Sequence, residues 1–186
     1  IGGFKFRDVT KKVGINSATF WSTGVSFIDI NNDGWLDIYV CAVDSPNKLY
    51  INNRGKFKES AGEFGLDFSG ASVSMSFADI DLDGDLDAYL LTNRLQDTDS
   101  TLNVKTLKNK PDPYVIDPKY EEVGYFIKRP GKVPLLVNAG QFDHLYLNDN
   151  GKFINVTKES GIGKNPYYGL SATWWDYNDD GLPDLY

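Results

Sequence analysis

A nine-residue pattern of acidic side chains occurs three times in the chain, at residues 29–37, 79–87 and 176–184, here named loop 1, loop 2 and loop 3. Aspartate or asparagine stands at positions 1, 3, 5 and 9 of each copy, and glycine stands at position 6. Alternate side chains of such a loop point inward and glycine permits a sharp turn, so the loop can surround a hard cation with oxygen atoms. Plain hairpin turns use the same residues, but three copies in one register predict calcium-binding loops.

The acidity of the chain has a local explanation in these loops. The 186 residues carry a formal net charge of −7, which argues against nucleic acid as a partner because phosphate binding needs a basic face. The loops hold ten carboxylates at positions 1, 3, 5 and 9, and three Ca²⁺ ions would bring the net charge from −7 to about −1. A content of 41% hydrophobic and 14% aromatic residues suits a packed globular core.

The single cysteine, the hydropathy of the chain and its two ends give three further expectations. Cys41 lies in an apolar run, so we expect a buried thiol in the core. No segment approaches the roughly 20 apolar residues of a transmembrane helix. The chain begins at Ile1 and ends at Tyr186 inside a strand pattern, which predicts a piece of a longer protein. Signals for secretion or surface anchoring are therefore expected outside these residues.

Phrases around the loops repeat with a period of about 50 residues, which is the signature of a repeat architecture. Residues 6–10 begin with Phe6 and return as 57–61 and 153–157, and residues 47–57 return as 143–153. The pattern within a unit has period two and is rich in aromatic and β-branched residues, which indicates strands. In the first unit we predict strands over 24–30, 36–43, 48–52 and 56–59. Four short antiparallel strands per unit predict an all-β fold, a β-propeller of which about three blades are present.

The first strand of each predicted blade favours small residues. Gly24 and Ser26 stand in the first unit, and serine or threonine occupies the matching positions of the others. Small side chains suit the crowded centre of a propeller, where the first strands of all blades meet.

The second unit contains an insertion. Tyr39 and Tyr50 are 11 residues apart, whereas the corresponding Tyr89 and Tyr146 are 57 apart, so about 46 residues are inserted, at about 93–142. The segment is too aromatic for a plain flexible linker, and a long ordered loop is usually functional or covers a packed surface. Successive connections of an up-and-down blade alternate between its two faces. The insertion is therefore expected on the face opposite the acidic loops.

The repeated phrases resemble the FG-GAP/VCBS repeat family, and in particular the cartilage acidic protein-like proteins. The resemblance rests on the three D-x-[DN]-x-D-G-x-x-D loops, the Phe-x-x-Val-Thr…Gly-Ile phrase and the Leu-Tyr-x-Asn…Gly-Lys-Phe phrase. It covers the chain except for the insertion, and it implies a seven-bladed, integrin-α-like propeller with Ca²⁺ in the loops. It also implies an extracellular or cell-surface protein that acts in adhesion or ligand binding.

The same resemblance implies the ligands, which are the side chains at positions 1, 3, 5 and 9 and the backbone carbonyl at position 7. These are Asp29, Asn31, Asp33, Trp35 and Asp37 in loop 1, Asp79, Asp81, Asp83, Asp85 and Asp87 in loop 2, and Asp176, Asn178, Asp180, Leu182 and Asp184 in loop 3. Loop 2 carries four ligand carboxylates and is expected to bind Ca²⁺ most tightly. EF-hands are excluded because position 12 is Val40 or Leu90 in place of glutamate. Oxygen ligands alone argue against zinc or copper.

Two classes of function stay open at this point. The first is a calcium-binding propeller at the cell surface that binds a protein or glycan ligand through the insertion, or docks there into a surface complex. The second is a calcium-stabilised propeller enzyme acting on polysaccharide, as a lyase or hydrolase. His144 is the only histidine, and we interpret it as a surface strand residue, so no histidine-based catalytic triad can be built. We interpret Trp174 and Trp175 as blade packing in preference to a sugar platform.

Overall fold

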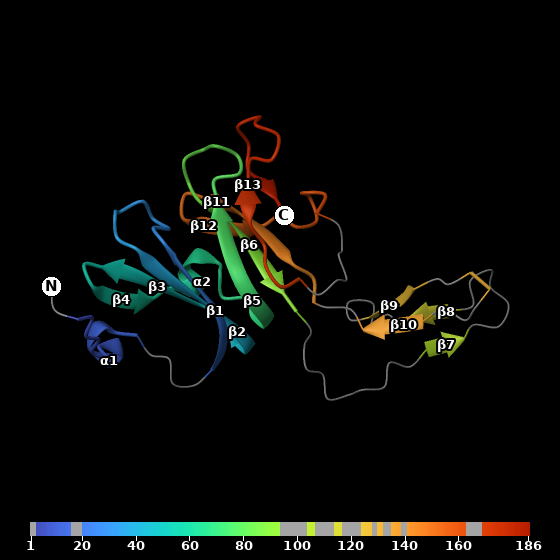
Figure 1. The fold of residues 1–186 in the computed structure, drawn as a ribbon, viewed down its shortest axis with the longest axis horizontal. Coiled ribbons are helices and arrows are strands. Elements are labelled where there is room, and N and C mark those ends of the chain that lie inside the picture. The colour runs from blue at the N-terminus through green and yellow to red at the C-terminus, as the bar shows by residue number, and fades with distance from the viewer. Residues whose placement is uncertain are drawn as a thin grey trace.

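The computed structural model describes residues 3–15, 20–93, 104–106, 114–116, 124–127, 130–131, 135–138, 141–162 and 169–186. Figure 1 shows these residues as a twisted sheet of antiparallel strands, with a group of short strands beside it. The first unit contributes β1 (Trp21–Ile28), β2 (Asp37–Pro46), β3 (Lys48–Asn53) and β4 (Lys56–Glu59). The second contributes β5 (Ser69–Ala78), β6 (Asp87–Thr92), β11 (His144–Asp149) and β12 (Lys152–Asn155). The third contributes β13 (Trp174–Trp175) and β14 (Asp184–Leu185).

The strand order confirms the predicted all-β class and the four-stranded antiparallel units of a partial β-propeller. β1 pairs with β2, β2 with β3 and β3 with β4, and β5, β6, β11 and β12 repeat this path. The predicted boundaries of the third and fourth strands are right within one residue. The first strand begins three residues earlier than predicted, at Trp21, and the second ends three residues later, at Pro46.

One pairing between the units was not predicted. Residues 43–46 at the end of β2 pair with residues 69–71 at the start of β5, so both units join one eight-stranded sheet. The additional residues at the end of β2 form this pairing, which explains why β2 is longer than its period-two pattern indicated. A pattern within one strand carries no information about which strand lies beside it.

The small residues of the first strands lie where these strands approach each other. A Cβ atom on Gly24 of β1 would collide with the backbone carbonyl of Val73 in β5. The hydroxyl groups of Thr23 and Ser26 donate hydrogen bonds to the carbonyls of Ser72 and Met75, each over 2.7 Å. The expectation that small side chains belong at crowded positions is therefore confirmed for β1 against β5.

In the part of the chain that the structure describes, two apolar clusters form the core, one at each junction between units. Tyr39, Cys41 and Leu49 of the first unit belong to a buried cluster with Met75 and Leu90 of the second. Cys41 is 1% exposed, as predicted, and burial raises the pKa of its thiol to about 12. A second cluster joins the second unit to the third, and the residues concerned are Tyr89, Leu91, Leu145, Trp174 and Leu185.

An edge-to-face aromatic pair repeats at both junctions. The ring of Tyr39 in β2 meets Phe77 in β5 with centroids 6.1 Å apart, and Tyr89 in β6 meets Trp174 in β13 at 6.4 Å. Such T-shaped pairs contribute about 0.5–1.5 kcal/mol beyond the burial of their area. Each tyrosine is the second residue after the last aspartate of its loop, and each partner ring is the second residue before the first aspartate of the next. The repeat phrase therefore specifies the junction as well as the unit.

Two single-turn helices appear among the described residues, although no helical periodicity was found in the sequence. They are α1 (Thr10–Val13) and α2 (Ala61–Phe64), and each ends at a glycine with positive φ, Gly14 and Gly65. Four residues are too few to show a 3.6-residue pattern, so the signal was absent.

Both helices pack against a fourth strand through the same contacts. A Cβ on Gly14 would lie 2.6 Å from the carbonyl oxygen of Phe57 in β4, and a Cβ on Gly65 would lie 2.8 Å from that of Phe153 in β12. Lysine Nζ atoms add a hydrogen bond at each place, from Lys56 to the carbonyl of Lys12 over 2.9 Å and from Lys152 to that of Glu63 over 3.5 Å. The Gly-Ile and Gly-Lys-Phe phrases are therefore the two halves of one contact.

The chain leaves β6 after Thr92 and returns at His144 in β11, so the segment between them begins at the end of β6 that lies away from loop 2. Four short strands are described within it: β7 (Val104–Thr106), β8 (Tyr114–Ile116), β9 (Gly124–Ile127) and β10 (Leu135–Asn138). β7 pairs with β8 and β9 with β10, as two sheets separate from the eight-stranded sheet. Residues 93, 130–131 and 141–142 of the predicted insertion are also described, and its remaining residues lie outside the described ones.

Candidate metal-binding loops

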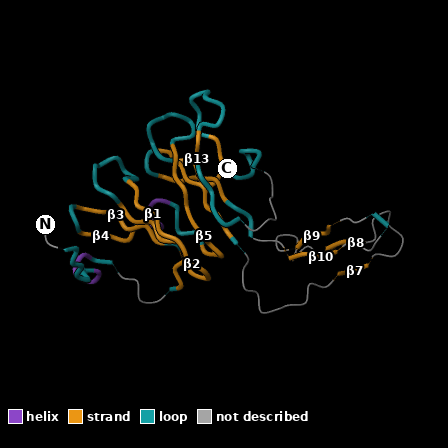
Figure 2. Tube along the Cα trace, viewed as in Figure 1, coloured by secondary structure: helices purple, strands orange, loops and turns teal. Residues whose placement is uncertain are grey.

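The three acidic loops project from one side of the sheet, where they join β1 to β2, β5 to β6 and β13 to β14 (Figure 2). In loop 1 the carboxylate of Asp29 accepts hydrogen bonds from the N–H groups of Asp33 (2.9 Å) and Gly34 (2.8 Å). The carboxylate of Asp33 accepts one from the N–H of Trp35 over 2.8 Å. The same bonds recur in loop 2 and in loop 3, at distances from 2.9 to 3.1 Å. Side chains at the predicted ligand positions thus shape each loop.

The turn in each loop uses two residues with positive φ, whereas the sequence indicated one. Glycine at position 6 has φ of 84°, 98° and 87° in loops 1, 2 and 3. Position 4 is also left-handed, with φ of 57° at Asn32, 61° at Leu82 and 57° at Asp179. Asparagine and aspartate tolerate this region, but leucine rarely adopts it. Position 4 was missed because its three residues share no chemical type.

The aspartate at position 9 connects the first two loops to the sheet. Asp37 is 0% exposed, and it accepts hydrogen bonds from the N–H of Ile30 (3.1 Å) and the N–H of Asn52 in β3 (2.6 Å). Asp87 is 1% exposed and accepts the same bonds from Ile80 (3.0 Å) and Asn148 in β11 (2.8 Å). Both carboxylates are therefore held in place before any ion is considered.

Burial raises the pKa of both position-9 carboxylates. For Asp87 desolvation is the largest cause, the hydrogen bonds from Asn148 and Ile80 oppose it, and the negative charges of Asp81 and Asp83 raise the pKa further. Asp37 shows the same balance, with burial first and with neighbouring loop carboxylates adding to it. A cation beside these groups would act in the opposite direction, because it favours the ionised form.

Asn52 and Asn148 are structural residues of the site that the sequence reading did not assign. The side-chain amide of Asn52 donates to the carbonyl of Leu36 over 2.8 Å, and its oxygen accepts from the N–H of Gly55 over 2.7 Å. Asn148 makes the equivalent bonds with Leu86 (3.2 Å) and Gly151 (2.8 Å). Each asparagine thus ties the end of an acidic loop to the turn between the third and fourth strands. The signal was present in the sequence as the asparagine of the Leu-Tyr-x-Asn phrase.

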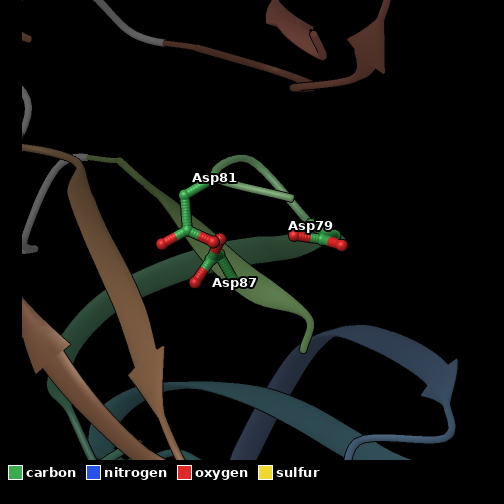
Figure 3. A group of neighbouring side chains, drawn as sticks. All are labelled: Asp79, Asp81 and Asp87. Atoms are coloured by element: carbon green, nitrogen blue, oxygen red, sulfur yellow. The ribbon is translucent and has the colours of Figure 1, made fainter. Parts of the chain in front are cut away.

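Three carboxylates converge in loop 2. Ligand oxygens of Asp79, Asp81 and Asp87 all lie within 4.8 Å of one another, a spacing that could hold a metal ion (Figure 3). They come from positions 1, 3 and 9, so the first turn of the loop and the start of β6 meet at this point. Among the described residues this is the one group of three or more such side chains with that spacing. The predicted ligand Asp83 is not part of this group.

Loops 1 and 3 differ from loop 2 at position 3. There Asn31 and Asn178 replace Asp81, so positions 1, 3 and 9 carry two carboxylates and one amide. The amide nitrogen of Asn31 donates to the carboxylate of Asp33 over 3.1 Å, and Asn178 donates to Asp180 over 2.9 Å. Two carboxylates at positions 3 and 5 cannot make this bond. Loop 2 therefore has the greater need for a cation to offset repulsion between its carboxylates.

Loop 3 lacks one connection that the other two loops have. Asp184 accepts a hydrogen bond from the N–H of Tyr177 over 2.9 Å, as Asp37 and Asp87 do from their own loops. Among the described residues Asp184 is exposed. The structure thus keeps the predicted local frame of loop 3.

The expectations for His144 and the two tryptophans are only partly right. His144 is half-buried, with its ring centroid 4.5 Å from that of Phe68 and its Nδ1 3.1 Å from the side-chain nitrogen of Asn155. Trp174 packs in the core, as predicted. Trp175 is 65% exposed and its ring centroid lies 5.9 Å from that of Tyr177, so its assignment to blade packing stays a prediction. Neighbouring residues of a strand point to opposite faces, and only one face of β13 is covered.

Four-stranded antiparallel units joined through repeated aromatic contacts, with acidic loops on one side, define a partial β-propeller. Comparison with known protein families finds an FG-GAP-like repeat at residues 29–90, which include loop 1, loop 2 and the strands between them. Comparison with curated proteins finds no match. Among the described residues, the helices are too short to cross a membrane.

Proposed function

We propose that this chain is a calcium-binding β-propeller module of an extracellular or cell-surface protein, related to the cartilage acidic protein-like group, that binds a protein or glycan ligand. The observation that carries the proposal is the convergence of Asp79, Asp81 and Asp87 within 4.8 Å inside an FG-GAP-like repeat. Propellers of this repeat type serve in adhesion and ligand binding, and their loops commonly bind Ca²⁺. The enzyme alternative stays a prediction from the sequence alone.

The donors fit calcium better than other metals. Every side chain at the predicted ligand positions offers oxygen, which suits Ca²⁺ and disfavours zinc and copper. The predicted ions would be held by Asp29, Asn31, Asp33, Asp37 and the carbonyl of Trp35 in loop 1, by Asp79, Asp81, Asp83, Asp87 and the carbonyl of Asp85 in loop 2, and by Asp176, Asn178, Asp180, Asp184 and the carbonyl of Leu182 in loop 3. A bound ion would neutralise clustered carboxylates and brace the loop.

Replacing Asp81 by asparagine tests the assignment of loop 2. Asp81→Asn is expected to lower the affinity of this site for Ca²⁺ about tenfold, or about 1.4 kcal/mol, because ligand charge sets the affinity of such sites. Isothermal titration of the whole chain with CaCl₂ measures the effect. Asp85→Asn is the matched control, since it removes the same charge from the same loop but leaves the backbone carbonyl predicted to bind the ion. Equal affinities for the two variants would count against the assigned ligands.

The ligand-binding part of the proposal assigns recognition to the insertion at about 93–142, and the contacts at its base support a separable role. The carboxylate of Asp143 accepts hydrogen bonds from the N–H of Thr92 (2.7 Å) and the hydroxyl of Tyr89 (2.8 Å). In the first unit Asn47 occupies the same repeat position and accepts from the N–H of Ala42 over 2.8 Å. The same side-chain-to-backbone hydrogen bond, Asn47 to Ala42 in the first unit and Asp143 to Thr92 in the second, therefore joins the ends of both connections. The first connection has four residues, 43–46, and the second has fifty, 93–142.

This equivalence specifies a loop exchange. Replacing residues 93–142 by the 43–46 connection is expected to keep calcium binding, because Tyr89, Thr92 and Asp143 are retained. The midpoint of thermal unfolding is expected to fall somewhat, because the hydrogen bonds of Asn93 and Gln141 to Ala71 and Thr92 are lost. Binding to a ligand identified on a glycan array or an array of extracellular proteins is expected to be lost. Circular dichroism and calcium titration monitor the fold. A loop-exchanged chain that folds, binds Ca²⁺ and still binds the same ligand would contradict the assignment of recognition to the insertion.

A further inference from the structure

A hydrogen-bonded bridge joins loop 1 to loop 2. The side-chain nitrogen of Asn32, at position 4 of loop 1, donates to the carboxylate of Asp85 over 3.1 Å and to the carbonyl of Gly84 over 3.3 Å. The amide has two hydrogens, so it can serve both acceptors at once. These are direct contacts between two acidic loops that lie 50 residues apart in the sequence.

The bridge reaches predicted ligands on both sides. The carbonyl of Gly84 and the N–H of Asp85 belong to one peptide plane, so fixing the carbonyl also fixes the direction of that N–H. The N–H of Asp85 donates to the carboxylate of Asp83 over 2.9 Å. Asp83 is a predicted ligand of loop 2, and the backbone carbonyl of Asp85 is another. On the loop 1 side, Asn32 stands between Asn31 and Asp33, which are also predicted ligands.

The position of Asn32 is set by the turn of loop 1. Its backbone has φ of 57°, a left-handed conformation that asparagine adopts more readily than most residues. Asp29 holds the same turn by accepting hydrogen bonds from the N–H groups of Asp33 and Gly34. An ion that ordered loop 1 would therefore also order the side chain that contacts loop 2.

We propose that Asn32 couples the calcium sites of loop 1 and loop 2, so that each site binds Ca²⁺ more tightly when the other is filled. The inference rests on the proposed function, because it requires that both loops bind the ion. Coupling between two sites is reciprocal, since it is a property of their joint free energy. Loop 2 and loop 3 cannot form the same side-chain bridge. The positions equivalent to Asn32 and Asp85 are both leucine, Leu82 at position 4 of loop 2 and Leu182 at position 7 of loop 3. Neither side chain can donate or accept a hydrogen bond.

The test is a mutant cycle in the whole chain carrying Asp180→Ala, which disables loop 3 and leaves two sites to be titrated with CaCl₂. Disabling loop 2 by Asp83→Ala is expected to weaken binding at loop 1 roughly 2- to 10-fold, the range for loss of one hydrogen-bonded contact. In a chain that also carries Asn32→Gly, Asp83→Ala is expected to leave the Ca²⁺ affinity of loop 1 unchanged. Glycine is chosen because it accepts the positive φ of this position.

Leu82→Gly is the matched control, because it changes the same position of the neighbouring loop, where φ is 61°. The effect of Asp83→Ala on loop 1 is expected to persist in that variant. If loop 1 affinity does not respond to loop 2 in the chain with Asn32 intact, or still responds in Asn32→Gly, the coupling is overturned while the calcium sites stand. If the unsubstituted chain binds no Ca²⁺, the proposed function fails and the coupling fails with it.

Discussion

Calcium is expected to raise the midpoint of thermal unfolding of this chain by roughly 5–11 °C for each site filled. An ion that binds only the folded state stabilises it by about 2.7 kcal/mol at a hundredfold excess over Kd, and 1 kcal/mol shifts the midpoint by about 2–4 °C at this chain length. The structure explains why the effect should be large. Burial and the negative charges of Asp81 and Asp83 raise the pKa of the Asp87 carboxyl, although hydrogen bonds from Asn148 and Ile80 oppose this, and a cation beside it would favour the ionised form.

The measurement is a melt followed by circular dichroism, first in excess EDTA and then in millimolar CaCl₂. Magnesium chloride at the same concentration controls for screening, because Mg²⁺ demands a smaller octahedral site and keeps its waters. A large calcium-specific rise would establish the loops as structural metal sites. Equal midpoints in EDTA and in CaCl₂ would reduce the loops to acidic turns and would remove the calcium argument for an extracellular module.

Gly65→Ala is expected to destabilise the fold more than the same change at Gly161. Both glycines close the same repeat phrase, and their φ values are 79° and 75°. A methyl group at Gly65 would lie 2.8 Å from the carbonyl oxygen of Phe153. At Gly161 no atom lies within 4 Å of that position in the part of the chain that the structure describes. Both variants share the strain of a left-handed alanine, about 1–2 kcal/mol, and Gly65→Ala adds about 1–3 kcal/mol of overpacking.

Urea unfolding in the presence of Ca²⁺ measures the difference as a change in the free energy of unfolding. Gly14→Ala extends the comparison, since a Cβ there would lie 2.6 Å from the carbonyl of Phe57. It should resemble Gly65→Ala, because α1 and α2 contact β4 and β12 in the same way. Equal losses at Gly65 and Gly161 would show that backbone strain alone accounts for the effect. The contact between the helix and the fourth strand would then make no measurable contribution to the free energy of unfolding.

The repeated phrases contain residues that form the contacts between units, but the sequence analysis did not assign this role to them. Tyr39 and Phe77 occupy fixed positions relative to their loops, and the same positions hold Tyr89 and Trp174. Their spacing was visible in the sequence, but which strand lies opposite which could be known only from the pairing of β2 with β5. Asn52 and Asn148 were visible in the same way as members of a phrase. Their role became clear only when β3 and β11 were placed beside Asp37 and Asp87.

The sequence by itself determined the acidic loops, the strand content and the 50-residue unit. These depend on spacings within a few residues: position 1 reaches the N–H groups of positions 5 and 6, and period two sets the faces of a strand. Tertiary structure alone decided which of these residues are buried and which loops touch. Asp87 is buried because β11 lies beside β6, where the N–H of Asn148 donates a hydrogen bond to its carboxylate. Likewise, Asn32 meets Asp85 only because the sheet sets two loops side by side, which no local spacing encodes.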